Sequence, residues 1–378
     1  MDIITLLYSV GIATGFCTKL RVMHLIGLSE ISFLVIVLMA IFREKFASLY
    51  QHSNIKNDMF IMFFIPIIII FVNPLMTLLN YKFLHLCCLY PHYIPGYIMA
   101  FLIFLATLLY LNNNKINLRK ISIFSAIIFI ALNIIVTLCG KNYYMWNIYR
   151  FDSFAINPNQ VAIYGFFMIF LLWQDINLKK ANFINNITLT TIIIFIVYFT
   201  KSDAFYLAVF LAFVSCVILF LLTYNKTTFI ITIFFFVIAI ALSLQHLDFL
   251  VELWKKADDG TFNRLYLTVN GIKALSYSPF AGLGSGSFSG IVKPFSGSEV
   301  HNTFLDFSVR FGVVFATYIY YIIVKYIVYT IKNRQIYRSG VGIGLLSLSL
   351  FHFIGRHFTF WVILAIMYYI FSHNKQLQ

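Results

Sequence analysis

Charged side chains are too scarce in this chain to cover the surface of a water-soluble protein. Of its 378 residues, 61% are hydrophobic and 11% are charged, whereas an ordinary soluble domain is about 25% charged. A membrane-spanning helix needs about 20 predominantly apolar residues, and stretches of nearly this length recur along the whole chain. The composition therefore excludes a soluble domain and predicts an all-α polytopic membrane protein.

Polar, proline and glycine clusters divide the chain into about 12 predicted transmembrane helices. They belong to a single integral membrane domain, residues 1–378, and no cleavable signal peptide is expected because the first apolar stretch lacks a basic start and a small-residue cleavage site. Several predicted helices are short, so two neighbours could form one span. The predicted spans are 3–16, 22–42, 59–79, 93–111, 121–138, 157–173, 187–200, 204–223, 228–247, 303–330, 341–355 and 358–371.

The orientation follows from loop charges, although the signal is weak. With the N- and C-termini in the cytoplasm, slightly more Lys and Arg fall in cytoplasmic loops than outside, so the positive-inside rule is only just obeyed. Basic residues on the outer side could be solvated loop charges, or they could bind an anion there. The formal net charge of +14 fits an anionic lipid or lipid-linked substrate better than nucleic acid in a chain this apolar.

One long loop, residues 248–302, is predicted to be periplasmic in this topology. Within it, Phe262, Leu265 and Val269 recur near helical spacing, and Pro279 ends the run. This pattern predicts an amphipathic helix lying on the membrane surface. Long loops often carry function, so we expect the site here.

Two segments combine polar and turn-forming residues. Asn157 and Pro158 suit the cap and first turn of a helix, a role that leaves the preceding Arg150 unexplained. In SPFAGLGSGSFSG, Gly282 and Gly284 allow sharp turns and close approach to a ligand or another segment, or form a flexible connector. Arg264 ahead of them can grip a phosphate with two parallel hydrogen bonds.

A third segment, EVHNTFLDFSVRFG, stands where the long loop re-enters the membrane. Imidazole can exchange a proton near neutral pH, so His301 is either a structural histidine or a general base, with Asn302 beside it. Asp306 and Arg310 are spaced to pair with each other within the following span. The five cysteines have no metal-like spacing, and we expect neither a disulfide framework nor a metal.

These segments together resemble the O-antigen polymerase and ligase superfamily, the Wzy and WaaL proteins of surface-polysaccharide assembly. The resemblance runs from Arg150 to Gly312 and covers Arg150 with NPNQVA, then TKSDAFYLAVF, NRLYLTVNGIKALSYSPFAGLGSGSF and HNTFLDFSVRFG, in the family's order. The chain departs from the family at Ser202-Asp203, where Ser-Arg is common, and Lys201 is a candidate substitute for that arginine.

The resemblance implies metal-independent glycosyl transfer at the periplasmic face of a bacterial inner membrane, without a cofactor. Attack from the face opposite the leaving diphosphate would invert the anomeric centre. The expected partners are an undecaprenyl-diphosphate-linked oligosaccharide, membrane lipids and, among proteins, a chain-length regulator. An O-antigen polymerase is favoured; the alternatives are an O-antigen ligase that transfers glycan to lipid A core and, from another class, a polysaccharide flippase or transporter. With the resemblance, His301 is the expected general base, Arg150 and Arg264 are the expected diphosphate ligands, and Asn302, Gly282 and Gly284 are expected to support them. Arg356 lies outside the matched region, and its place at another external helix end makes it a further candidate ligand of the diphosphate.

Overall fold

The structure is a computed structural model of the chain, and it is mostly helical. It describes residues 2–22, 26–44, 58, 60–84, 93–139, 145–146, 150–174, 180–224, 261–291, 293, 295 and 297–373. The predicted span 228–247 and the first part of the predicted loop, 248–260, lie outside the described residues.

Helices and short helical turns make up the first third of the chain. In order they are α1 (Ile3–Thr14), the 3₁₀ turn η1 (Thr18–Leu20), α2 (Leu28–Met39), the π-helical turns η2 (Ala40–Glu44), η4 (Phe60–Phe64) and η5 (Ile67–Val72), α4 (Asn73–Leu84), α5 (Ile94–Asn112) and α6 (Leu118–Leu138).

A pair of two-residue strands precedes the remaining helices. The elements are β1 (Met145–Trp146), β2 (Arg150–Phe151), α7 (Pro158–Leu172), α8 (Lys180–Tyr198), α9 (Asp203–Tyr224), α12 (Thr261–Leu275), α13 (Thr303–Phe311), α14 (Val313–Lys332), α15 (Ile336–Phe351) and α16 (Phe358–His373). Strands β1 and β2 pair antiparallel, with Met145 opposite Phe151.

Four helices within the described part are long and apolar enough to cross a membrane. They are α5, α6, α9 and α14, and six shorter apolar helices accompany them. The helical class is therefore confirmed, and length and composition indicate a membrane protein. The number of spans, their orientation and the periplasmic placement of the loop stay predictions.

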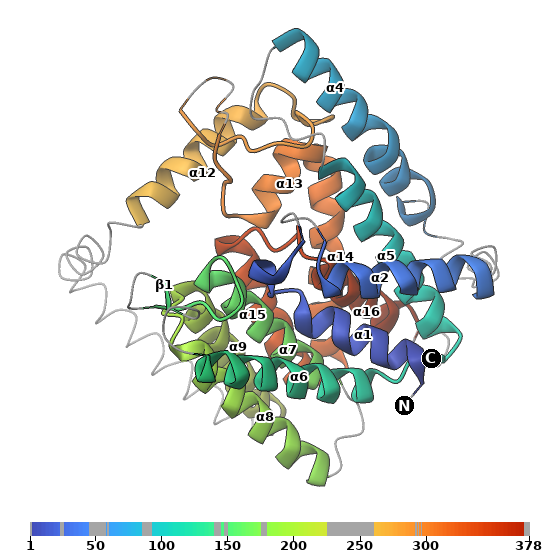
Figure 1. Ribbon diagram of the computed structural model, residues 1–378, viewed down its shortest axis with the longest axis vertical. Helices are drawn as coiled ribbons and strands as arrows, with labels where there is room; N and C mark the ends of the chain where they lie inside the picture. The colour runs from blue at the N-terminus through green and yellow to red at the C-terminus, as the bar shows by residue number, and fades with distance from the viewer. Residues whose placement is uncertain are drawn as a thin grey trace.

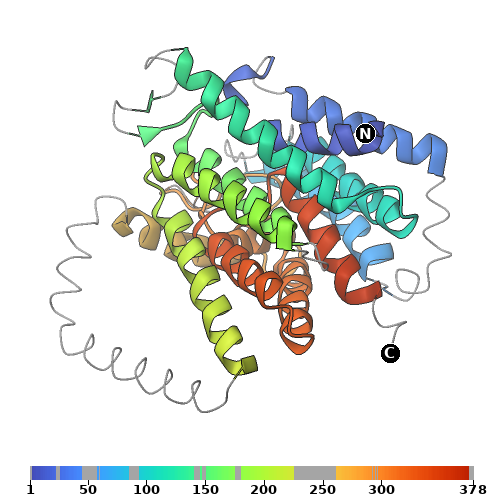
Figure 2. The ribbon, with the colours of Figure 1, turned by 90° about the horizontal axis from the view of Figure 1, so that it is seen from below.

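Helices α7 and α16 form the centre of the molecule, because their residues are buried at nearly every position. Helix α16 packs against α5, α14, α7 and α1, while α7 contacts α6, α8, α9 and α15. Figure 1 shows α16 with α1, α5 and α14 close to it, and Figure 2 shows the same grouping from below. The outer helix α9 leaves Phe210, Phe213 and Phe220 exposed, as lipid-facing side chains would be.

The predicted span 303–330 is wrong as a single helix, because the chain breaks at Gly312 into α13 and α14. Gly312 has a φ of +92°, which L side chains rarely adopt. The Leu283 N–H donates to the Val309 carbonyl (2.7 Å) and the Gly284 N–H to the Arg310 carbonyl (3.2 Å). The last carbonyls of α13 are thus satisfied by the glycine-rich segment rather than by a continuing helix.

The predicted cap at Asn157 is confirmed, and a second cap is present at Asn302. The Asn157 side chain accepts from the Asn159 N–H at the start of α7, with Pro158 in its first turn. The Asn302 side chain accepts from the Leu305 N–H at the start of α13 (3.0 Å). Both caps supply an acceptor to N–H groups that a helix leaves unpaired.

The helix predicted within the long loop is also present, as α12. Its apolar Leu265, Val269 and Ile272 are exposed, while the buried Asn270 donates to the Ser289 and Gly290 carbonyls. Helix α12 contacts α13 through this inner side, and Figure 1 shows it beside α13 and away from the central helices. An outward apolar face fits contact with lipid.

Candidate functional site

A polar cavity of about 330 Å³ lies where five segments that are far apart in the sequence meet. They are the η1–α2 connection, the start of α5, the start of α7, the segment running into α13, and the turn before α16. Three guanidinium groups and two carboxylates line it: Arg21, Arg310 and Arg356, with Glu30 and Glu299. Such a surplus of guanidinium groups suits an anion that can accept several hydrogen bonds.

Arg310 is the most deeply buried of these cations, with 1% of its side chain exposed. Its Nη1 donates to the Tyr97 hydroxyl (2.6 Å), and its Nη2 lies 3.4 Å from Asp306 Oδ1, one helical turn back. The guanidinium also stacks over the Phe353 ring, 4.5 Å from its centroid. Its Nε has no hydrogen-bond partner among the described residues, so donor capacity remains unused.

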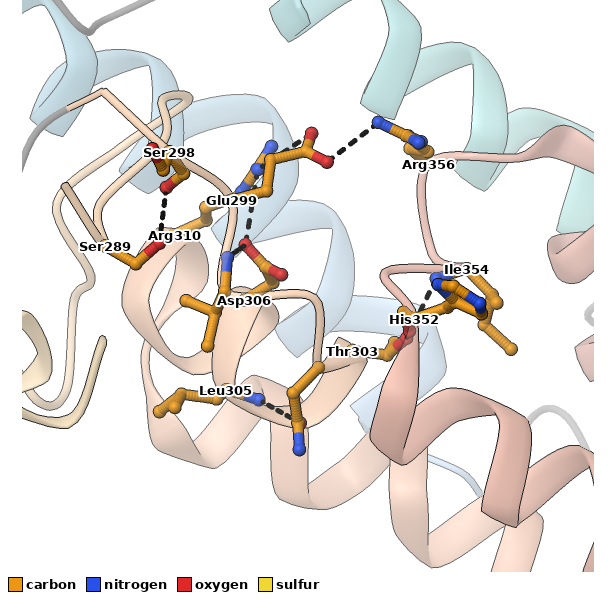
Figure 3. A network of polar contacts seen from close by, with 12 residues as sticks. Ser289, Ser298, Glu299, Thr303, Leu305, Asp306, Arg310, His352, Ile354 and Arg356 are labelled. Carbon is orange, nitrogen blue, oxygen red and sulfur yellow. Dashed lines mark hydrogen bonds and ion pairs between the residues drawn. The ribbon is translucent and has the colours of Figure 1, made fainter. Parts of the chain in front are cut away.

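The Glu299 carboxylate lies between two arginines that come from different elements (Figure 3). Its Oε2 accepts from Arg356 Nη1 at 2.8 Å, and its Oε1 lies 3.6 Å from Arg310 Nη2. Burial raises the pKa of the Glu299 carboxyl, but the charges of Arg356 and Arg310 outweigh burial and hold that pKa below its ordinary value. Glu299 is therefore ionised at neutral pH.

The turn that carries Arg356 is tied to the start of α13. The Thr303 hydroxyl donates to the His352 carbonyl (2.6 Å) and accepts from the Ile354 N–H (2.9 Å), as Figure 3 shows. The Asn302 side-chain amide donates to the Leu350 carbonyl (3.1 Å). These bonds fix the base of the turn, while 40% of the Arg356 side chain remains exposed.

On another wall of the cavity, Arg21 pairs with Glu30 at 2.5 Å. The second oxygen of Glu30 accepts from the Gly27 N–H at the start of α2 (2.9 Å), so this pair is part of a helix cap. His357 also lines the cavity, and its Nε2 has no hydrogen-bond partner among the described residues. Burial lowers the pKa of His357 well below its ordinary value, and the charges of Arg356 and Arg21 add to this. A neutral imidazole results.

Of the predicted diphosphate ligands, the structure brings Arg356 to the cavity and places Arg150 elsewhere. Arg150 Nε donates to the Thr200 carbonyl (2.8 Å), and its Nη2 donates to the Asn159 side chain (3.0 Å) and the Lys201 carbonyl (3.3 Å). Lys201 itself has a φ of +49°. Arg150 thus fastens the α8–α9 turn to the start of α7, which is a structural use of the guanidinium.

The predicted general base, His301, has an exposed side chain and is not among the residues that line the cavity. Its backbone has a φ of +59°, and its charge when protonated favours the ionised form of Glu299. Arg264 belongs to the first turn of α12, and its side chain lies outside the described part of the structure. Its role stays a prediction.

The predicted supporting glycines allow close approach to another segment of the chain. Gly282 and Gly284 have φ values of +72° and +98°, and a Cβ on Gly284 would lie 2.7 Å from the Thr77 Cα. The Ser285 N–H donates to the Thr77 hydroxyl (2.8 Å), and the Asn80 amide donates to the Leu283 carbonyl (2.7 Å). The glycine-rich segment is therefore fitted between α4 and the end of α13.

Glu299, Arg21 and Tyr97 were missed by sequence reasoning as site residues. A signal existed for Glu299, which stands two residues before His301 in the singled-out segment. For Tyr97 and Arg21 there was none, because only the packing of α5 and the η1–α2 connection brings them to α13. Arg310 was expected to pair with Asp306, and that pair is confirmed, but its position on the cavity was not foreseen.

Among the described residues, no group of three or more His, Cys, Asp or Glu side chains is arranged to hold a metal ion. Comparison with protein-family models and with curated proteins finds no match to this chain.

Proposed function

We propose that this protein is a membrane glycosyltransferase of the O-antigen polymerase type. It transfers a glycan carried on undecaprenyl diphosphate onto an incoming lipid-linked repeat unit, at the periplasmic face of the inner membrane. The polar cavity is the donor site, and its arginines bind the diphosphate.

The observation that carries this proposal is the meeting of Arg21, Arg310 and Arg356 in one cavity of about 330 Å³. A cavity of this size accommodates a diphosphate with part of a sugar. A departing diphosphate gains negative charge as the glycosidic bond breaks, and preorganised guanidinium groups stabilise that charge in the transition state. Arg310 is held by Tyr97, Asp306 and Phe353, so little reorganisation is needed when the charge develops.

The membrane character of the chain supports a lipid-linked donor. Long apolar helices and the exposed apolar face of α12 provide surfaces along which a prenyl chain can lie while its diphosphate enters a polar site. The roles of the predicted ligands change accordingly: Arg356 keeps its diphosphate role, Arg310 and Arg21 join it, and Arg150 becomes a residue that stabilises the fold. Arg264 remains a candidate from the loop helix.

The binding test uses the purified full-length protein in nanodiscs and two ligands, undecaprenyl diphosphate and undecaprenyl monophosphate. We expect the diphosphate to bind more tightly, because the second phosphate engages further guanidinium donors. Arg334→Ala is the matched control, since Arg334 is exposed beyond the far end of α14, about 30 Å of helix away from Gly312. Equal affinity for both lipids, unchanged by Arg356→Ala, would contradict the proposal.

The reaction is tested in a deletion strain by analysis of lipopolysaccharide. Loss of a polymerase leaves core capped with a single repeat unit. Bare core with accumulated long lipid-linked glycan would instead indicate a ligase, and bare core with only single lipid-linked repeat units retained on the cytoplasmic side would indicate a flippase.

A further inference from the structure

Glu299 has few partners for a carboxylate with only 19% of its side chain exposed. Its Oε2 accepts a hydrogen bond from Arg356, and its Oε1 forms an ion pair with Arg310 at 3.6 Å. No further hydrogen bond to its side chain is present among the described residues. Carboxylates that are largely removed from water are ordinarily also held by backbone N–H groups or hydroxyls. Glu299 is held by guanidinium groups that line the cavity, so its position depends on whatever else those groups bind.

A diphosphate in the cavity competes with Glu299 for the same donors. Arg310 keeps three other contacts, to Tyr97, Asp306 and Phe353, when its contact with Glu299 is lost. Arg356 is 40% exposed and has Glu299 as its ion-pair partner. When the diphosphate replaces Glu299, both Arg310 and Arg356 therefore still have an anionic partner.

We infer that Glu299 pairs with Arg356 and Arg310 until the donor binds, releases both arginines to the donor diphosphate, and then accepts the proton of the acceptor hydroxyl. This inference rests on the proposed function. In the step, the acceptor oxygen forms a bond to the anomeric carbon, and the bond from that carbon to the diphosphate oxygen breaks with its electron pair leaving on the diphosphate. The hydroxyl proton passes to the Glu299 carboxylate, so charge and atoms balance.

The position of Glu299 favours it over His301 for this role. Glu299 lines the cavity, whereas the His301 side chain is exposed outside the lining. A base must come within hydrogen-bond reach of the proton that it takes. Glu299 also becomes a stronger base when it is released from the arginines. The two positive charges that hold its pKa low are then shared with the diphosphate.

A distinct pH dependence follows from this exchange. In the free enzyme the Glu299 pKa is low, and in the donor complex it rises, so the acidic limb of kcat should lie at higher pH than that of kcat/KM. Activity falls with decreasing pH because the protonated carboxyl cannot accept a proton. The charged and titratable groups that face Glu299 are Arg356 from the turn before α16, Arg310 and Asp306 from α13, Tyr97 from α5, and His301 on its own segment.

The experiment compares wild-type protein, Glu299→Gln and His301→Gln in nanodiscs, with two measurements. The first is the dissociation constant for undecaprenyl diphosphate without a sugar. Glu299→Gln should bind about three- to tenfold more tightly, because the competing charge is gone. The second is single-turnover transfer from the lipid-linked repeat unit, which should fall about 10²–10⁴-fold in Glu299→Gln and stay near wild type in His301→Gln.

Each outcome separates this inference from the proposed function. Wild-type transfer by Glu299→Gln, weaker lipid binding by that variant, or a large loss in His301→Gln alone would overturn the role of Glu299 while leaving the transferase intact. A wild-type protein that neither binds the lipid diphosphate nor transfers glycan would overturn the proposed function itself. If Glu299→Gln fails to fold, the wild-type pH profiles decide, since coincident acidic limbs of kcat and kcat/KM contradict the exchange.

Discussion

Arg356 and Arg150 are both arginines beside the start of a helix, yet the structure gives them opposite surroundings. The donors of Arg150 are directed to the Thr200 and Lys201 carbonyls and the Asn159 side chain, whereas Arg356 pairs with the Glu299 carboxylate at the edge of a cavity. Backbone carbonyls cannot leave without unfolding a turn, but a carboxylate can be replaced by another anion. An arginine therefore becomes a ligand-binding group only where its partners can be exchanged.

The largest effect is expected at Arg310. It has fixed partners, Tyr97 and Asp306, and it also contacts Glu299, which another anion can replace. Arg310→Ala should abolish transfer and lower the free energy of unfolding by about 3–5 kcal/mol, because the buried Asp306 loses its partner and the contacts of the guanidinium with Tyr97 and Phe353 are lost. Thermal unfolding and single-turnover transfer measure the two effects. The double variant Arg310→Met with Asp306→Asn should recover stability but not transfer. Normal stability of Arg310→Ala would show that the charge cluster is not a structural unit.

Arg356→Ala should lower transfer about 10²-fold, since one donor to the developing charge is lost. The free energy of unfolding should change by less than about 1 kcal/mol because the side chain is substantially exposed. Arg356→Lys should restore activity only in part, as an ammonium lacks the bidentate fork. Steady-state kinetics and a thermal melting curve measure the two effects. Full activity of Arg356→Ala would mean that Arg356, like Arg150, does not bind the donor.

Arg150→Ala should show the reverse pattern. Loss of its hydrogen bonds to two carbonyls should reduce the free energy of unfolding by about 1–3 kcal/mol, while the folded fraction keeps wild-type affinity for undecaprenyl diphosphate. Chemical denaturation and lipid binding by the same preparation test this. A well-folded Arg150→Ala protein that no longer binds the lipid would show that Arg150 is a ligand of the diphosphate.

The smallest effect is expected at Asn159, which accepts one hydrogen bond from Arg150 (3.0 Å). Asn159→Ala should lower the free energy of unfolding by about 0.5–1.5 kcal/mol and leave transfer unchanged. Combining it with Arg150→Ala in a double-mutant cycle should show coupling between the two sites. If the two losses of unfolding free energy simply add, the hydrogen bond between Asn159 and Arg150 does not stabilise the fold.

Much of the local structure was predictable because it depends on neighbours in sequence. The cap at Asn157, Pro158 in the first turn of α7, the loop helix α12 and the Asp306–Arg310 pair all follow from short-range rules of helix geometry. The break at Gly312 was not predicted, since an apolar stretch with one glycine reads as a continuous span. The turn there is stabilised by the Val313 N–H donating to the Pro279 carbonyl (2.8 Å), a contact outside the helix itself.

The sequence by itself determined that the chain is helical and suited to a membrane, because its few charges cannot cover a surface in water. It also determined where many helices begin. Only the tertiary structure decided which arginines share a cavity, since Arg21, Tyr97, Glu299 and Arg356 come from separate helix ends. Helix rules act over about four residues, whereas this site depends on how α2, α5, α13 and α16 pack together.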